Sequence, residues 1–270
     1  MPELPEIVVF ARDMQKSLVG RRIARIEVLQ PKCLNLPPER FQSALSGARI
    51  LSVRAHGKWL QVQTTQGWLL LNLGMGGEIL LVERDHLPAK HRLLFDLDDG
   101  QTLAVNFWWF GYAHFAPDPA DHPMVGKLGP HALDLSLDDF RALLAGRRGA
   151  IKALLLDQDR IAGIGNVYIQ DPLFQAGIHP LRSVQTLSER EVAALWGALG
   201  ETLQGSIDAG GARFELNLYG QKGGWPVEFL VGYREGKPCP RCGTTVVKVK
   251  TGSTAGYICP SCQPREGRKV

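Results

Sequence analysis

The sequence predicts an α+β protein with several domains: an N-terminal β-sandwich with a leading helix, a helical domain, and a C-terminal four-cysteine zinc finger on a β-hairpin. A chain of 270 residues suits two or three domains. Short apolar segments separated by turn residues fill residues 50–115, a spacing typical of a sandwich or barrel. Helical periodicity replaces them after Pro130, and two Cys-x-x-Cys pairs follow near the C-terminus.

The first predicted element is a helix that begins near Pro5. Proline suits the first turn of a helix, and the helix dipole favours the carboxylate of Glu6 there. Apolar residues recur at helical spacing from Ile7 to Leu18, and Gly20 ends the pattern. Such a helix would hold the N-terminus against the body of the first domain.

The first domain is predicted to span residues 1–118 and to be mostly β. A strand begins at Ile23, and a short helix is expected at residues 39–45. Seven further strands, separated by turn residues, are expected at residues 50–55, 58–63, 68–73, 78–82, 92–97, 101–106 and 112–115. Pro117, Pro119 and Pro123 then mark a linker.

The second domain is predicted to be helical and to span residues 131–233. Its apolar residues follow a helical period at residues 135–144, 150–156, 166–176 and 187–207. Ser136 is placed to cap the first of these helices. Gly210 and Gly211 then open a loop, rich in glycine, asparagine and aromatic residues, that runs to about Trp225.

The third domain, residues 234–270, holds two cysteine pairs that are sixteen residues apart. Four cysteines in this pattern predict one zinc ion bound by four thiolates, namely those of Cys239, Cys242, Cys259 and Cys262. Such a zinc is structural, because the four thiolates leave no open position for catalysis. Disulfides are the alternative, which a reducing cytosol disfavours. Alternating valines and lysines between the pairs predict a β-hairpin, and Cys33 is expected to be a buried thiol.

Positive charge is concentrated in this third domain. Residues 234–270 carry eight lysines or arginines against two glutamates, whereas the whole chain has a net charge of +4. A basic terminal module favours an anionic polymer as partner, and a solvated tail is the alternative. No apolar run reaches the roughly 20 residues of a membrane span, and no secretory signal is recognised. We expect a cytoplasmic protein, monomeric and without a membrane partner.

The N-terminal segment offers a nucleophile. Removal of Met1 would leave Pro2 as a secondary amine, and an α-amino group titrates near about 8. Amines of this kind form Schiff bases with carbonyl carbons. The neighbouring Glu3 is placed to move protons. For this segment alone, a frayed terminus without function is the alternative.

Seven stretches of the chain carry a resemblance to a known family. They are MPELPEI at the N-terminus, HGK at 56–58, LGM at 73–75, FG at 110–111, DQDRIAGIGNVYIQDPLFQAGIHP at 157–180, EGKPCPRCG at 235–243 and CPSCQ at 259–263. Together they resemble the formamidopyrimidine-DNA glycosylase and endonuclease VIII family of base-excision repair enzymes. The resemblance implies a helix–two-turn–helix domain and a DNA glycosylase with AP lyase activity. Its partner would be double-stranded DNA with damaged bases or abasic sites.

For the chemistry, the resemblance implies that Pro2 attacks C1′ of a damaged nucleoside, expels the base and forms a Schiff base. Elimination would then cut the strand. Glu3 would be the proton shuttle, and Glu6 a second carboxylate that supports the site. Lys58, at a β-turn, matches the lysine that grips a phosphate near the lesion.

For DNA binding, the resemblance makes Asn166 part of a phosphate clamp at a helix start, and Lys152 a further phosphate contact. Extrusion of the base leaves a gap, at a cost of roughly a few kcal/mol of unstacking. Met75 and Phe110 match two of the residues that fill this gap in the family. The glycine-rich loop that ends near residue 225 matches the segment that covers the flipped base.

Three departures from the family pattern matter. Residues 106–111 are NFWWFG where the family usually has DPRRFG, so Trp108 replaces an arginine that reads the orphaned base. Its indole offers only one donor. Thr254 replaces a phosphate-holding arginine of the finger, and Asn72 replaces a histidine before Leu-Gly-Met. We expect an altered substrate or opposite-base preference, and stacking by Trp108 suits single-stranded or distorted DNA.

Two other classes of function stay open at the level of sequence. A non-catalytic protein that keeps the fold would bind damaged DNA and form no covalent adduct. A zinc-finger scaffold for protein partners would show no steep salt dependence of DNA binding, and the basic hairpin disfavours it. A DNA-repair role would place the chain on the nucleoid of a bacterial-type cytoplasm.

Overall fold

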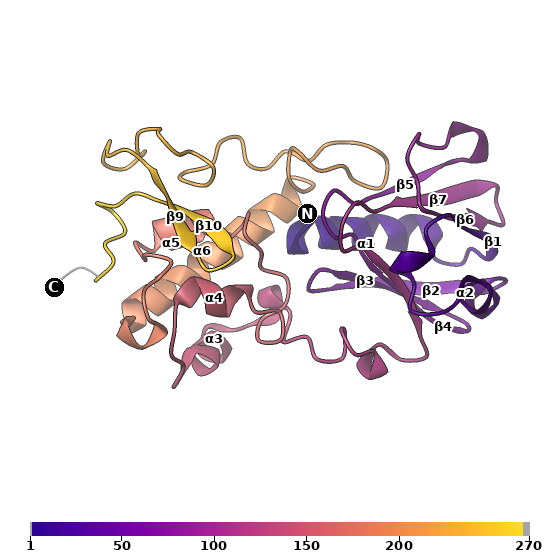
Figure 1. Cartoon of the computed structure of the whole chain (residues 1–270), viewed down its shortest axis with the longest axis horizontal. Coiled ribbons are helices and arrows are strands. Elements are labelled where there is room, and N and C mark those ends of the chain that lie inside the picture. Colours follow the sequence, from indigo (N-terminus) through magenta and orange to yellow (C-terminus); the bar gives the residue numbers. More distant parts are fainter. Residues whose placement is uncertain (1, 267–270) are drawn as a thin grey trace. The chain divides into compact units, whose positions relative to one another are not determined.

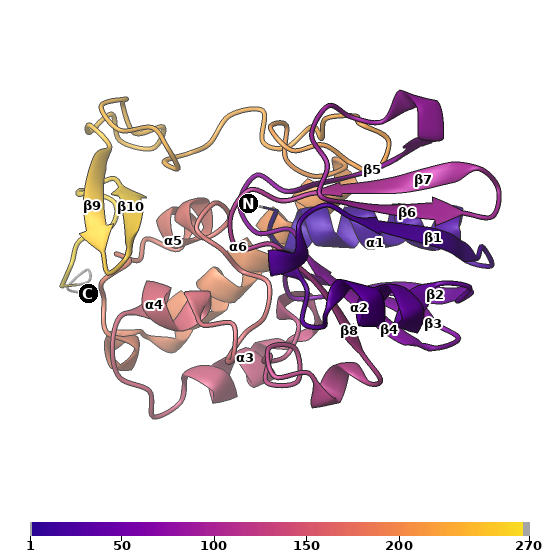
Figure 2. The same ribbon diagram turned by 45° about the vertical axis from the view of Figure 1, so that its right-hand side comes forward.

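The computed structural model describes residues 2–266, which form two compact units (Figures 1 and 2). The first unit contains the chain up to Lys127 together with Ala209–Gly224. The second contains Leu128–Asp208 and the chain from Trp225 onward. Among the described residues, no helix is both long enough and apolar enough to cross a membrane.

The first unit begins with helix α1 (Leu4–Leu18), as the sequence predicts. Pro5 lies in its first turn, and Glu6 supplies a carboxylate there. The apolar face of α1, with Ile7, Phe10 and Met14, is buried in the core of the unit. Burial of such a side chain contributes about 1.5–3 kcal/mol relative to exposure. The helix therefore anchors the N-terminal segment to the sandwich.

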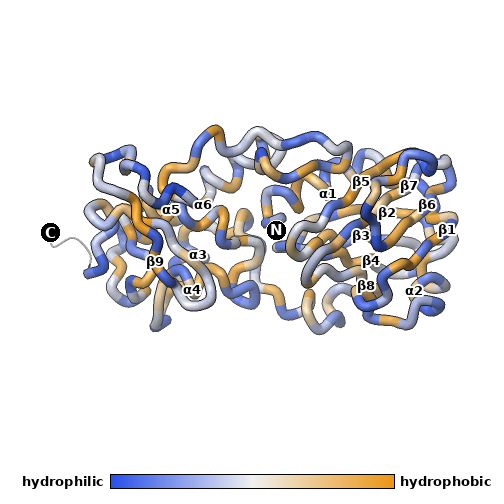
Figure 3. Tube along the Cα trace, turned by 45° about the horizontal axis from the view of Figure 1, so that its top comes forward, coloured by the Kyte–Doolittle hydropathy of each residue, from blue (hydrophilic) through white to orange (hydrophobic). Residues whose placement is uncertain are grey.

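Two antiparallel four-stranded sheets form the sandwich, and α1 runs between the two groups of strands in Figures 1 and 2. The first sheet has the order β1 (Ile23–Val28), β6 (Leu93–Leu97), β7 (Gln101–Asn106), β5 (Glu78–Glu83). The second has the order β2 (Ile50–His56), β3 (Trp59–Thr64), β4 (Gly67–Asn72), β8 (Tyr112–Ala116). Hydrophobic and hydrophilic residues alternate along several of these strands (Figure 3). The predicted β-sandwich is confirmed.

Short elements complete the first unit. Helix α2 spans Pro38–Leu45, and its Phe41 and Leu45 are buried in the same core. Three 3₁₀ turns connect the larger elements: η1 (Pro31–Cys33), η2 (Arg84–His86) and η3 (Pro119–Asp121). Cys33 is buried, as predicted, and burial raises the pKa of its thiol to about 11.

The segment Ala209–Gly224 packs with the first unit, although its place in the sequence assigns it to the helical domain. Leu218 is buried in the core of the sandwich, and its carbonyl oxygen accepts a hydrogen bond from the N–H of Leu81 over 2.9 Å. The composition of a loop does not show where the loop packs. From the sequence, the segment is therefore assigned to the helical domain only because it follows that domain's last predicted helix.

The second unit contains four helices among the described residues: α3 (Leu137–Leu144), α4 (Ile151–Leu156), α5 (Gln170–Gln175) and α6 (Glu189–Asp208). Two 3₁₀ turns, η4 (Ala132–Asp134) and η5 (Val184–Thr186), lie among them. Ser136 caps α3 through a reciprocal pair of hydrogen bonds with Asp139, as predicted. Helix α5 begins four residues later than the predicted start at residue 166.

A β-hairpin of β9 (Val247–Thr251) and β10 (Thr254–Ile258) lies between the two cysteine pairs, as predicted. Its register pairs Thr251 with Thr254 across the turn. The hairpin clusters with the helices in the second unit, so the zinc finger and the helical domain form one compact body.

Candidate active site and DNA-contact residues

The N-terminus of α1 gathers two buried carboxylates beside Pro2. Pro2 is buried, and the side chains of Glu3 and Glu6 are 2% and 4% exposed. The N–H of Glu3 donates to Oε2 of Glu6 over 2.9 Å. The other carboxylate oxygen of Glu6, Oε1, accepts from the N–H of Ala212 over 3.0 Å. Glu6 therefore ties the predicted nucleophile segment to the loop Ala209–Gly224.

Lys58 lies in the turn between β2 and β3, which is shifted by one residue from its predicted position because β2 ends at His56 and β3 begins at Trp59. Gly57 makes this turn with φ +56°, a conformation that favours glycine. Burial lowers the pKa of Lys58, and the charges of Glu3 and Glu6 oppose that shift by raising it. The opposing effects of both carboxylates mean that Lys58 and the N-terminal acids share one electrostatic environment.

Asn72, one of the three departures from the family pattern, has both ends of its amide engaged. Its Nδ2 donates to the carbonyl oxygen of Lys58 over 3.1 Å, and its Oδ1 accepts from the N–H of Gly74 over 3.0 Å. This bridge is not predicted from the sequence. The available signal was a polar residue at the end of β4, directly before a glycine-containing loop.

Two adjoining loops of the first unit expose large apolar side chains. Trp108, Trp109 and Phe110 are 65%, 60% and 72% exposed, and Met75 in the facing loop is 49% exposed. Backbone hydrogen bonds of 2.8 and 3.4 Å between Met75 and Trp109 hold the loops together. The close contact requires Gly74, because a Cβ atom there would lie 2.1 Å from the carbonyl oxygen of Trp109. Exposed apolar patches of this kind mark interaction sites.

Asn166 lies in the second unit, in the turns that precede α5. The segment before it includes Gly163, with φ +113°, whose N–H donates to the side chain of Gln158 over 2.9 Å. Asn166 is therefore four residues before the helix instead of at its start. Its side-chain oxygen accepts from Nε2 of Gln170 over 3.0 Å.

Lys152, predicted as a phosphate contact, is only 1% exposed. Its Nζ donates to Oγ1 of Thr251 over 2.9 Å and to the carbonyl oxygen of Ala255 over 2.6 Å. Burial lowers its pKa to about 8. Lys152 lies on the face of α4 toward the hairpin, and its ammonium group is hydrogen-bonded to the zinc finger. Thr254 lies at the same turn, with its hydroxyl 3.2 Å from that of Thr251.

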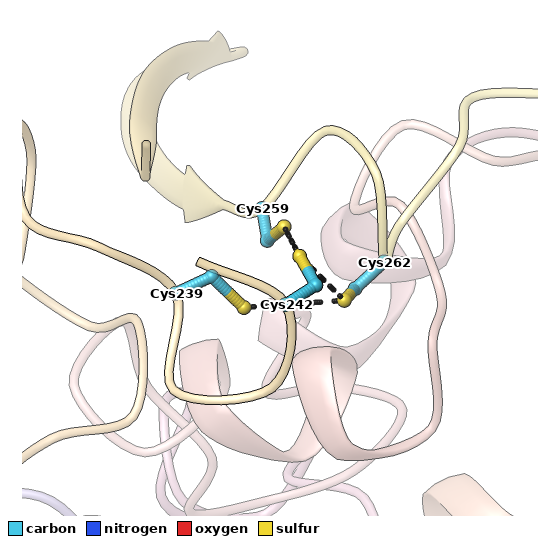
Figure 4. Close-up of side chains that lie close together, drawn as sticks. All are labelled: Cys239, Cys242, Cys259 and Cys262. Carbon is cyan, nitrogen blue, oxygen red and sulfur yellow. Dashed lines mark hydrogen bonds between the residues drawn. The ribbon is translucent and has the colours of Figure 1, made fainter. Parts of the chain in front are cut away.

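The four predicted zinc ligands converge in one cluster (Figure 4). Their sulfur atoms all lie within 4.8 Å of one another. The separations are 3.4 Å for Cys242 and Cys259, 3.5 Å for Cys242 and Cys262, and 3.9 Å for Cys239 and Cys262. A tetrahedron with Zn–S bonds of about 2.3 Å separates its sulfurs by about 3.8 Å. The cluster therefore fits one structural zinc ion.

Comparison with protein-family models identifies three consecutive domains. Residues 1–107 match the formamidopyrimidine-DNA glycosylase N-terminal domain, and residues 128–217 match the H2TH domain of the same enzymes. Residues 236–265 match the zinc finger found in FPG and IleRS.

Similar proteins extend the match over almost the entire chain. Formamidopyrimidine-DNA glycosylases of Pelotomaculum thermopropionicum and Chloroflexus aggregans are 37% and 38% identical, over 97% of this chain and 99% and 98% of theirs. Among solved structures, a Lactococcus lactis FPG mutant in complex with Fapy-dG containing DNA gives a TM-score of 0.89 at 29% identity, over 97% of this chain and 100% of that one. Lactococcus lactis Fpg with abasic-site DNA gives 0.88 at 29% identity, over 97% and 99%. Because whole-length relatives exceed 30% identity and the fold and cysteine cluster agree with them, the chain belongs to the formamidopyrimidine-DNA glycosylase family.

Proposed function

We propose that this DNA glycosylase of base excision repair uses Pro2 as its nucleophile and cleaves the strand as an AP lyase. The observation that carries the proposal is the grouping of Glu3, Glu6 and the electrostatically linked Lys58 around the N-terminus of α1. Two buried carboxylates beside a helix N-terminus, with a lysine in the same environment, suit proton transfer next to a nucleophilic amine. We expect the substrate to be double-stranded DNA that contains a damaged base or an abasic site.

The reaction follows from the chemistry of a secondary amine. Once Met1 is removed, the lone pair of the Pro2 nitrogen attacks C1′, and the bond from C1′ to the base breaks with its electron pair on the base. The proton that the amine loses neutralises the departing base. Opening of the sugar ring, with proton transfer to its oxygen through Glu3, gives the iminium. Loss of a proton from C2′ then expels the 3′ phosphate, and water hydrolyses the iminium to free Pro2. Glu6 holds this segment through Glu3 and Ala212, and Lys58 contacts a phosphate near the lesion.

We further propose that the exposed aromatic loop changes how the opposite strand is read. We expect Met75, Trp108 and Phe110, which are exposed on adjoining loops, to enter the gap left by the extruded base. An arginine would read the orphaned base by several hydrogen bonds, whereas an indole stacks on any base. The expected result is a weak opposite-base preference and activity that extends to single-stranded or distorted DNA. Such activity is expected in a bacterial-type cytoplasm.

Borohydride trapping tests the nucleophile. The purified protein is incubated with a duplex that carries one abasic site, reduced, and examined for a covalent complex. Wild type is compared with Pro2→Gly and with a protein that keeps one additional residue before Pro2. We expect an adduct only where the terminal proline amine is free, because reduction traps only an iminium.

The same trapping experiment distinguishes the proposed enzyme from the alternative, a non-catalytic binder of damaged DNA. A retained fold without chemistry predicts tight binding to the abasic duplex and no adduct from any protein. That outcome would make the chain a non-catalytic binder of damaged DNA and would overturn the proposed mechanism.

A further inference from the structure

Gln170 is a buried polar residue that the proposed mechanism does not use. It is the first residue of α5, and only 2% of its surface is exposed. A buried amide is costly unless it is hydrogen-bonded, so its partners define its role. These partners come from two segments far apart in sequence: the turn that carries Asn166, and strand β10 of the zinc finger.

Backbone groups fix the orientation of the Gln170 amide. Its Oε1 accepts from the N–H of Tyr257 over 3.1 Å, a group that can only donate. Its Nε2 donates to the carbonyl oxygen of Asn166 over 2.8 Å and to that of Ala255 over 3.2 Å, and carbonyl oxygens can only accept. A flipped amide would place its NH₂ against an N–H and its oxygen against two carbonyls.

The orientation of Gln170 determines that of Asn166. Nε2 of Gln170 lies 3.0 Å from the side-chain amide of Asn166, and because Nε2 is a donor, the facing atom is Oδ1. The NH₂ group of Asn166 therefore occupies the other branch of its amide, directed away from Gln170. A phosphate oxygen accepts hydrogen bonds, so only this orientation of Asn166 is suited to bind one.

We propose that Gln170 is a positioning residue that directs the NH₂ group of Asn166 toward a DNA phosphate. The folded zinc finger holds Gln170 in place and so supports that phosphate contact. The inference rests on the proposed DNA-binding role of Asn166. Strand β10 provides both the Tyr257 donor and the Ala255 acceptor that hold Gln170. Lys152 donates a second hydrogen bond to the same Ala255 carbonyl oxygen. The finger thus acts on the phosphate contact through Gln170.

A double-mutant cycle tests this role. The affinity for a duplex with a tetrahydrofuran abasic analogue is measured for wild type, Asn166→Ala, Gln170→Met and the double variant. Methionine keeps the volume of Gln170 and removes its hydrogen bonds. We expect Asn166→Ala to lose about tenfold in affinity, the effect of one hydrogen bond to a charged group. Gln170→Met should lose about two- to tenfold, since a free Asn166 must be ordered on binding.

The double variant gives the decisive comparison. If Gln170 acts through Asn166, the double variant binds no more weakly than Asn166→Ala, because no amide remains to be oriented. Gln170→Glu provides a second variant, since it offers only acceptors and would draw the Asn166 NH₂ group inward. Its loss should exceed that of Gln170→Met, and the excess should vanish in the Asn166→Ala background. Penalties that add in the double variants would overturn the inference.

Two measurements keep the outcomes distinct. Zinc content and the melting temperature establish that each variant retains the finger. Should Gln170→Met lose zinc, side-chain NMR of the wild type decides: the NH₂ protons of Gln170 should resist exchange, and those of Asn166 should shift on addition of the abasic-analogue duplex. Rapid exchange at Gln170 would refute its fixed orientation. Wild-type affinity of Asn166→Ala would instead refute the proposed role of Asn166 itself.

Discussion

The side chain of Asn72 holds the backbone of Lys58: its Nδ2 donates to the Lys58 carbonyl oxygen over 3.1 Å. The same amide accepts from Gly74, which begins the Met75 loop. The Asn72 side chain therefore links two segments. One is the turn that carries Lys58, the predicted phosphate contact, and the other is the loop that carries Met75, the predicted gap-filling residue. Because both ends of its amide are hydrogen-bonded within the protein, we infer that Asn72 positions Lys58 and does not itself contact DNA.

Replacement of Asn72 should affect activity beyond its effect on stability. Asn72→Ala loses two hydrogen bonds, worth about 1–2 kcal/mol of unfolding free energy together. Asn35→Ala is a matched control, because the Asn35 amide also makes two hydrogen bonds to the backbone, with the N–H and the carbonyl oxygen of Phe115 at 2.9 and 2.8 Å. We expect similar loss of stability in both variants and slower adduct formation with abasic DNA only in Asn72→Ala. Equal trapping rates would reduce Asn72 to a structural role.

Trp108→Arg should restore a preference for the opposite base. An arginine can donate several hydrogen bonds to the orphaned base, and a correct bidentate pair gives about 1–3 kcal/mol of discrimination. Excision rates are measured for one lesion placed opposite each of the four bases. Trp109→Arg introduces the same positive charge at the adjacent exposed position and should leave the four excision rates similar. A strong preference in the wild type would contradict the proposed stacking role of Trp108.

Loss of zinc should abolish DNA binding with little effect on the sandwich. Cys259→Ser removes one of four ligands, and structural zinc sites contribute about 10–16 kcal/mol in finger peptides. Without the finger, β10 no longer holds Gln170 and Lys152. We expect loss of zinc and of binding to abasic DNA, monitored by metal analysis and fluorescence anisotropy.

Cys33→Ser is the control for this change, because it alters the buried cysteine that lies outside the cluster. It should retain one zinc ion per chain and normal DNA affinity. Full DNA binding by zinc-free Cys259→Ser would show that the finger is dispensable.

A pair of buried histidines should make the first unit sensitive to acid. Nδ1 of His122 accepts from the N–H of Val125, so its Nε2 carries the proton that it donates to Nδ1 of His114 over 2.8 Å. Burial, and secondarily His122, lower the pKa of His114 to about 4 from 6.5. Between pH 4 and pH 6.5 the unfolded chain therefore binds more protons at this residue than the folded chain does. The contribution of neutral His114 to the free energy of unfolding is fully present above pH 6.5 and is lost as the pH falls toward 4.

Thermal unfolding at neutral pH and near the middle of that window measures the effect. His114→Gln can still accept from His122 but does not titrate, so its melting temperature should fall less on acidification than that of the wild type. His86→Gln changes an exposed histidine and should behave as the wild type. An identical acid response of wild type and His114→Gln would exclude His114 as the source.

The sequence predicts best where a local pattern is sufficient. Alternation and turn residues locate the strands, and the spacing of four cysteines predicts the cluster around Cys259. The prediction is weakest where a contact joins distant segments. The sequence does not indicate that Lys152 is bonded to the zinc finger, because its partners Thr251 and Ala255 lie 99 and 103 residues away. The role of Gln170 is hidden in the sequence for the same reason, because nothing near it in the chain indicates its hydrogen bond to Tyr257.

The excursion of Ala209–Gly224 into the first unit determines how the polypeptide can be divided. The chain passes between the units at three points, after Lys127, after Asp208 and after Gly224. No single gene truncation therefore yields either unit whole. A fragment that ends at Lys127 lacks the backbone donor of Ala212 to Glu6 and the Leu218 side chain that fills its core. Expression of the whole first unit therefore requires an internal deletion that joins Lys127 to Ala209 through a linker, or a second fragment supplied in trans.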